Sequence, residues 1–215
     1  MRLRVARLVL PIIVCLPLAA QQLYTNGSIN GGIQGYSFTG ASGWQVADSF
    51  VLGASTTITG FSIGAWVLPG DQPVSTGWEI LTGGPSWQGG TVVAQGTATF
   101  SNVYWGKTSG YFADYFDIYT SSVSGLDVPL AGGTYWLELL NGTTQVSGNF
   151  IYWDETDGSS TAYQNQGVGL LGSEAFTING TASAQTVPEP GSLLLLGSGI
   201  LGVAALARRR MGLRL

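Results

Sequence analysis

The chain has 215 residues, including 33 glycines, no histidine and one cysteine, with a formal net charge of −4. The absence of histidine excludes the usual serine and cysteine triads and the commonest metal ligand, and one cysteine excludes an intramolecular disulfide. A hydrophobic share of 45% with only 9% charged residues excludes a disordered chain. The charge divides along the chain into +3 over residues 1–20, −10 over 21–187 and +3 over 188–215. The sequence therefore predicts three regions with separate roles.

Residues 1–20 have the pattern of a secretory signal peptide. Arg2, Arg4 and Arg7 form a basic start, an apolar run follows, and Ala19-Ala20 supplies small residues at the end. The apolar run, residues 8–18, is too short for a membrane span of roughly 20 residues. We therefore expect cleavage after Ala20.

Residues 21–186 are expected to form one all-β domain, a β-sandwich of jelly-roll or lectin-like type. Their apolar segments are short, rich in threonine, β-branched and aromatic residues, and separated by glycine, proline, asparagine or serine. In residues 56–68, Phe61, Ile63, Ala65 and Val67 share one face and Ser62, Gly64 and Trp66 share the other, as in a half-buried strand. The expected strands are 46–52, 56–68, 77–82, 91–100, 111–120, 126–130, 134–140, 149–154 and 174–180.

Three Asn-Gly pairs in this region, at 26–27, 141–142 and 179–180, predict turns, because both residue types tolerate positive φ. Residues 111–120 fit two structures. Aromatic residues at 112, 115, 116 and 119 match the spacing of an amphipathic helix, whereas aromatic enrichment and few strong helix formers favour a strand.

The C-terminal region, residues 187–215, begins with Val187-Pro188-Glu189-Pro190. The uncharged run 191–207 follows, and the basic residues Arg208, Arg209 and Arg210 come next. Seventeen helical residues rise about 25 Å, close to the lower limit for a membrane span. Because basic flanks stay in the cytoplasm, we expect a transmembrane helix with the β domain outside.

This order of motif, short span and basic end resembles the PEP-CTERM sorting signal of Gram-negative bacteria. The resemblance implies that an exosortase, a membrane-embedded transpeptidase, recognises residues 187–190 in the inner membrane and passes the protein to the cell surface or extracellular matrix. It also implies a setting of exopolysaccharide export and biofilm. The β domain is similar to others on such proteins in VADSFV (46–51), TITGFSIGAW (57–66), GGTYWLEL (132–139) and YWDE (152–155), a resemblance that implies no activity.

Catalysis and nucleic-acid binding are poorly supported by the charged residues. Glu79 and Glu138 are the conceivable carboxylate pair of a glycosidase, but the sequence does not place them together. Lys107 is the only cation in residues 21–187, so the domain cannot neutralise phosphates. We expect neither an enzyme nor a nucleic-acid-binding protein.

Calcium is the conceivable cofactor. Asp154, Glu155 and Asp157 precede a Gly-Ser-Ser loop, and oxygen-rich loops suit a hard cation. The segment does not follow the EF-hand pattern, so an acidic loop in contact with solvent is the alternative.

Carbohydrate binding is the sharpest functional hypothesis. Seven tryptophans and nine tyrosines offer flat apolar faces beside polar side chains, a combination that suits sugar rings. The aromatic residues expected near glycine-rich turns or on an outward face are Trp78, Trp87, Trp105, Tyr111 and Tyr115.

Two functions therefore remain. The first is a non-catalytic structural or weakly adhesive protein of an exopolysaccharide matrix; the second is a specific module for a carbohydrate or another surface ligand, ice included. Exposed aromatic residues that cluster favour the second, and aromatic residues buried throughout favour the first.

Overall fold

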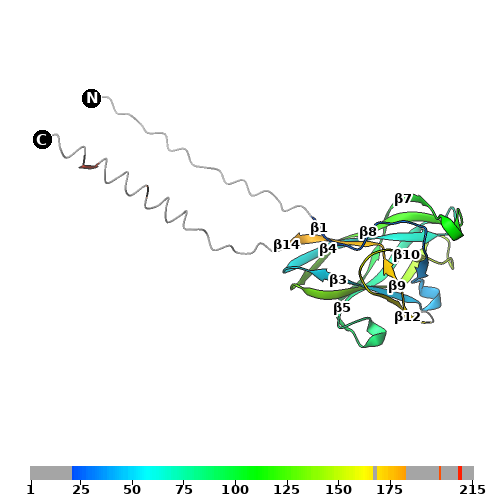
Figure 1. The fold of residues 1–215 in the computed structure, drawn as a ribbon, viewed down its shortest axis with the longest axis horizontal. Helices are drawn as coiled ribbons and strands as arrows, with labels where there is room; N and C mark the ends of the chain where they lie inside the picture. Colours follow the sequence, from blue (N-terminus) through cyan, green and yellow to red (C-terminus); the bar gives the residue numbers. More distant parts are fainter. Residues whose placement is uncertain (1–20, 167–168, 183–198, 200–207, 210–215) are drawn as a thin grey trace, which may run out of the picture. The chain divides into compact units, whose positions relative to one another are not determined.

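The computed structural model describes residues 21–166, 169–182, 199 and 208–209. All of its strands lie between Gln21 and Ala182, where they form two packed β-sheets (Figure 1). This arrangement confirms the expected all-β, sandwich-like domain. The expected signal peptide at 1–20, the sorting motif at 187–190 and the apolar run 191–207, apart from Gly199, lie outside the described residues. Within the part of the chain that is described, no helix is long and apolar enough to cross a membrane.

The first sheet has eight strands, in the order β1-β14-β4-β10-β13, with β2 beside β10, β8 beside β4, and β7 beside β8. Its long central strand is β4 (Thr56–Val67), which pairs along its length with β8 (Asp117–Leu130). The other strands are β1 (Gln21–Thr25), β2 (Gly35–Ser37), β7 (Ser101–Lys107), β10 (Tyr152–Thr156), β13 (Ser173–Glu174) and β14 (Phe176–Ala182).

The second sheet has six strands, in the order β12-β11-β3-β9-β5-β6. Its strands are β3 (Gln45–Leu52), β5 (Pro73–Thr82), β6 (Thr91–Thr99), β9 (Gly133–Thr144), β11 (Ala162–Gln164) and β12 (Gly169–Leu170). Three short 3-10 helices lie in the loops: η1 (Gly40–Ser42), η2 (Ser86–Gln88) and η3 (Gly110–Phe112).

The core lies between the two sheets and follows the alternation of the strands. Phe61, Ile63 and Val67 of β4 face it, as expected, and meet Leu137 and Leu139 of β9 from the other sheet. Burial of such side chains contributes about 25 cal/mol per Å² of apolar surface, which drives the two sheets together.

Trp66 belongs to the opposite face of β4 and is nevertheless 1% exposed. It packs in a second apolar cluster with Phe116 and Ile118, against Ile29, Phe112 and Tyr152.

The segment 111–116 adopts neither of its two expected structures. Gly110–Phe112 is a 3-10 turn, and β8 begins only at Asp117. The loop is closed by Thr108, whose Oγ1 accepts a hydrogen bond of 3.0 Å from the N–H of Phe116. Asp114 has a φ of 59°, a left-handed conformation that interrupts both a helix and a strand.

The turn prediction is wrong for Asn141-Gly142 and Asn179-Gly180, which lie within β9 and β14. At Gly142 a Cβ would lie 2.6 Å from ring atoms of Phe38 and from Ile151. Glycine is required there for close packing rather than for a hairpin.

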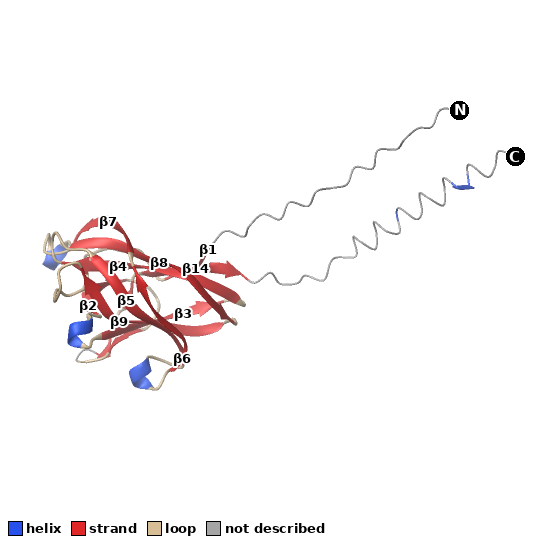
Figure 2. Cartoon of the chain, turned by 180° about the vertical axis from the view of Figure 1, so that it is seen from behind, coloured by secondary structure: helices blue, strands red, loops and turns tan. Residues whose placement is uncertain are grey.

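The two ends of the domain differ. The chain enters at β1 and leaves at β14, and these strands pair with each other next to Thr56 of β4. Val67, eleven residues further along β4, lies opposite Asp117 and is roughly 36 Å away at 3.3 Å per residue. The loops that contain η1 and η3 lie at this far end, as Figure 2 shows in blue.

Candidate carbohydrate site

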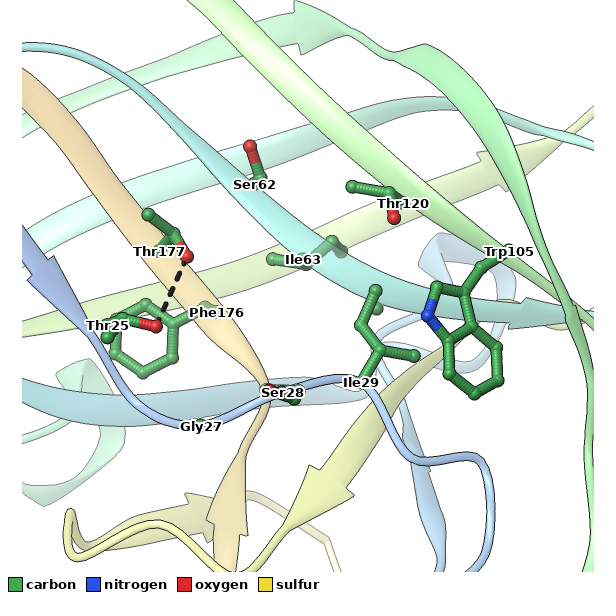
Figure 3. Close-up of a pocket in the computed structure, with 12 residues that line it drawn as sticks. Thr25, Gly27, Ser28, Ile29, Ser62, Ile63, Trp105, Thr120, Phe176 and Thr177 are labelled. Carbon is green, nitrogen blue, oxygen red and sulfur yellow. Dashed lines mark hydrogen bonds between the residues drawn. The ribbon is translucent and has the colours of Figure 1, made fainter. Parts of the chain in front are cut away.

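A cavity of about 280 Å³ opens beside β4, β7 and β14, at the outer face of the eight-stranded sheet (Figure 3). Trp105 lines one side and Ile29 lies close to it. The remaining wall is rich in hydroxyl groups, which belong to Thr25, Ser28, Ser62, Thr120 and Thr177. The hydroxyls of Thr25 and Thr177 are 3.4 Å apart, so the two side chains hold each other across the β1–β14 pair.

Gly64 of β4 leaves the room that the cavity wall needs. A Cβ at this position would lie 2.9 Å from Cγ1 of Ile29 and 2.8 Å from the Cβ of Asp154. The absence of a side chain therefore lets the segment around Ile29 lie close to the sheet.

Asp154 fixes that segment. Its Oδ2 accepts 2.9 Å from the N–H of Asn30, and its Oδ1 accepts 3.1 Å from the N–H of Gly31. The same Oδ1 accepts 2.7 Å from Nε1 of Trp66. Burial raises the pKa of Asp154 to about 6, and the charge of Glu155 raises it further. The three hydrogen-bond donors lower it but do not offset burial.

The five aromatic residues expected to bind sugar are distributed over four places. Trp105, 46% exposed, is on β7 at the cavity. Tyr111 and Tyr115, 93% and 61% exposed, share the η3 loop, and Trp87 is half-buried in η2.

Trp78 was expected to be exposed, and this prediction is wrong, because its exposed fraction is only 6%. The alternation of β5 turns Trp78 inwards with Ile80 and leaves Glu79 on the outer face. Its ring lies against Gly96 of β6, where a Cβ would approach the ring to 2.9 Å.

Glu79 and Glu138 stand directly opposite each other on β5 and β9. Glu138 has no exposed surface, and both of its oxygens accept hydrogen bonds from Ser86, from the N–H at 2.9 Å and from Oγ at 2.7 Å. Burial raises the pKa of Glu138, and the charge of Glu79 adds to the shift. The structure brings the pair together, but Glu138 holds the η2 loop in place instead of facing solvent.

The acidic residues expected at a calcium loop point in different directions. Both oxygens of Asp154 are taken by N–H donors, whereas Asp157 is exposed. Among the residues that the structure describes, no group of three or more acidic, histidine or cysteine side chains is arranged to hold a metal ion.

The sequence did not reveal two acids that have no exposed surface. Asp48 and Glu174 have no exposed surface, and both carboxylate oxygens of Glu174 lack a hydrogen-bond partner in the structure as described. Burial raises the pKa of Asp48 to about 7, and burial and the charge of Asp48 raise that of Glu174 well above its ordinary value. Alternation in β3 could have revealed Asp48, which lies between the inward residues Val46 and Phe50.

Comparison with known proteins identifies the C-terminal region only. Residues 186–210 match the PEP-CTERM protein-sorting motif. No curated protein and no solved structure matches the chain. The match covers the Val-Pro-Glu-Pro motif, the uncharged run and the three arginines that the sequence placed in this order. The chain therefore carries a PEP-CTERM sorting signal, which marks it as an exported protein sorted by an exosortase.

Proposed function

We propose that the β domain is a non-catalytic adhesive module that binds exopolysaccharide at the cell surface or in the matrix, with a sugar unit in the cavity beside Trp105. The observation that carries the proposal is the pairing of a 46% exposed indole with five hydroxyl side chains around one cavity. A sugar ring has apolar C–H faces and a polar rim, so an aromatic wall and a hydroxyl wall complement it.

The negative charge of the β domain favours an uncharged ligand over an anionic one. Residues 21–187 carry eleven acids and one cation, Lys107, so the domain is net negative and repels an anionic polymer. Neutral glycans bind by stacking and hydrogen bonds, which this charge distribution does not oppose.

The chemistry of the domain supports binding without catalysis. The chain has no histidine, and each of the two opposed glutamate pairs, Glu79–Glu138 and Glu155–Glu174, includes a fully buried member. Asp154, next to the cavity wall, is also buried and is occupied by three N–H donors. None of these carboxylates reaches a bound sugar as a general acid needs to.

The sorting signal supplies the location. The run 191–207 serves as the membrane-spanning segment until the exosortase acts at residues 187–190, after which the β domain reaches the surface or the matrix. Adhesion to exopolysaccharide is the role that such a location permits.

The test is a glycan array probed with the exported protein and with Trp105→Ala, Trp105→Phe and Val51→Ala. Trp105→Ala is expected to lose binding, and Trp105→Phe to keep part of it because a ring remains. Val51 is 57% exposed on β3 and serves as the control for removal of an exposed apolar side chain. Binding that is unchanged in Trp105→Ala, or absent for every glycan, contradicts the proposal.

A further inference from the structure

A row of aromatic side chains covers the far end of the domain. We call it the aromatic strip, and its members are Trp44, Tyr111, Tyr115, Phe150 and Tyr152. Tyr111, Tyr115 and Phe150 are 93%, 61% and 41% exposed, and Trp44 and Tyr152 are half-buried. The strip is assembled from segments that are distant in sequence: the loop after η1, the loop around η3, and the residues just before and at the start of β10. Scattered exposed apolar side chains are normal on a surface, but a contiguous group marks a binding surface.

The rings are linked along the strip, with the buried Phe116 joining Tyr115 to Tyr152. Tyr115 lies over Phe116 with ring centroids 4.8 Å apart, and Phe116 lies 5.3 Å from Tyr152. Tyr152 and Phe150 are 6.1 Å apart, as are Phe150 and Trp44.

The strip is supported from below. Phe112 lies 6.0 Å from Trp66, and Trp66 lies 5.7 Å from Phe116, so the rings rest on the buried cluster. Tyr111 is attached to this cluster through Phe112, at 5.0 Å. Rings held in this way lose little conformational freedom when a ligand stacks on them.

The strip is continuous with the cavity. Ile29 lines the cavity and also packs against the cluster of Trp66, Phe116 and Ile118. Phe112 and Tyr152 pack against the same cluster. Ile29 therefore connects the cavity wall to the cluster that supports the aromatic strip.

We propose that the aromatic strip forms additional sugar subsites, so that the ligand is an uncharged polysaccharide several sugar units long, bound from the cavity along the strip. This inference rests on the proposed function. Charge argues for this occupant over a second copy of the chain, because residues 21–187 carry a formal net charge of −10 and two net-negative copies repel each other. The hydroxyl-tipped rings of Tyr111, Tyr115 and Tyr152 also suit a ligand that has both apolar faces and hydroxyls.

The test measures how affinity depends on chain length. Calorimetry compares a disaccharide and a hexasaccharide of the sugar that binds best on the array, with the exported protein and its variants. The hexasaccharide is expected to bind about tenfold or more tighter than the disaccharide, since each added ring that stacks contributes on the order of 1 kcal/mol. The double variant Tyr111→Ala/Tyr115→Ala is expected to remove most of this gain and to leave the disaccharide affinity unchanged.

Three further variants show which side chains produce the gain in affinity with ligand length. Tyr111→Phe/Tyr115→Phe keeps the rings and is expected to keep most of the gain. Trp105→Ala is expected to weaken the binding of both the disaccharide and the hexasaccharide. Val51→Ala is expected to change neither affinity. Tyr111 and Tyr115 are exposed, so their removal leaves the core intact, which a thermal melt verifies.

The contradicting outcomes are distinct. A hexasaccharide that binds no tighter than the disaccharide, or a gain that survives the double alanine variant, overturns the aromatic strip alone. Sedimentation that shows a dimer lost in the same variant assigns the strip to a second copy and overturns the inference. Absence of binding to every glycan overturns the proposed function and this inference with it.

Discussion

The indole Nε1 of Trp66 donates a hydrogen bond of 2.7 Å to Oδ1 of Asp154, and this contact joins β4 to β10 beneath the cavity wall. Asp154 also accepts from the N–H groups of Asn30 and Gly31. One buried carboxylate thus links the central strand, a neighbouring strand and the segment that carries Ile29.

Replacing Asp154 with alanine is expected to lower the free energy of unfolding by about 3 kcal/mol or more, because three buried donors lose their acceptor. Urea unfolding measures the effect. Asp127, exposed on β8, provides the matched control, and Asp127→Ala is expected to change stability by less than about 0.5 kcal/mol. Equal effects at the two positions would show that the hydrogen bonds of Asp154 are not stabilising.

Stability is expected to fall as the pH rises from about 4 to about 7. The pKa values of Asp48 and Asp154 are raised by burial from 3.8 to about 7 and about 6, so the folded state retains protons that the unfolded state releases in this window. Glu174, whose pKa is also raised, acts in the same direction. Urea midpoints across the pH range measure the slope, and Asp48→Asn is expected to flatten it. A midpoint that rises over this window contradicts the assignment.

Glu174→Leu is expected to stabilise the protein by about 1–2 kcal/mol at neutral pH. The carboxylate of Glu174 is fully buried and both of its oxygens lack a described partner, so its removal relieves a desolvation penalty. The backbone N–H and C=O of residue 174 keep their hydrogen bonds to Asp48 and Asn26 in the variant. Asp157→Leu, at an exposed acidic position, is the control and is expected to change little. A loss of stability in Glu174→Leu would mean that the carboxylate has a partner in solution.

Gly60→Ala is expected to cost at least about 2 kcal/mol. A Cβ at this position in β4 would lie 2.2 Å from the carbonyl oxygen of Val123 on β8, a contact that only a backbone shift relieves. At Gly53 no other atom lies within 4 Å of the position that a Cβ would take. Gly53→Ala is therefore the control, and thermal melts of the two variants should differ by several degrees. A melt of Gly60→Ala that matches the control refutes the expected clash.

Alanine at Pro188, Glu189 and Pro190 together is expected to abolish sorting while the β domain still folds, because these residues lie outside its strands. Fractionated cells, probed for the β domain by immunoblot, should show the unprocessed chain retained in the cells. Asp157→Ala, at an exposed position after β10, is the control. Normal processing of the motif variant would show that the exosortase does not need these three residues to recognise the protein.

The local pattern of the sequence predicted the fold class and the best strands, because a half-buried strand records its faces in every second residue. The segments 46–52 and 56–68 appear as β3 and β4 with the expected inward residues on β4. The same pattern did not predict that Trp78 is buried. Alternation shows which residues of β5 share a face, but it does not show which face the other sheet covers.

The site itself was only partly accessible to prediction. Trp105, Tyr111 and Tyr115 were identified as aromatic residues free to bind sugar, and the structure exposes all three. The hydroxyl wall was missed because it combines β1, β4, β8, β14 and the segment 27–29, which the sheet order alone brings together. Trp44, Phe150 and Tyr152 were missed because the loop after η1 and the start of β10, which hold them, meet only at the far end of the domain.

The pairing of β14 between β1 and β4 has a mechanical consequence. The chain leaves the domain along β14, while the aromatic strip lies at the opposite end. When a bound polymer pulls on the strip and the cell holds the C-terminal side, the load runs parallel to the strands. The hydrogen bonds of β14 to both neighbours then share the force and must break together, in shear, rather than one after another. If the strip binds a polymer as proposed, this architecture suits a protein that resists flow while it holds that ligand.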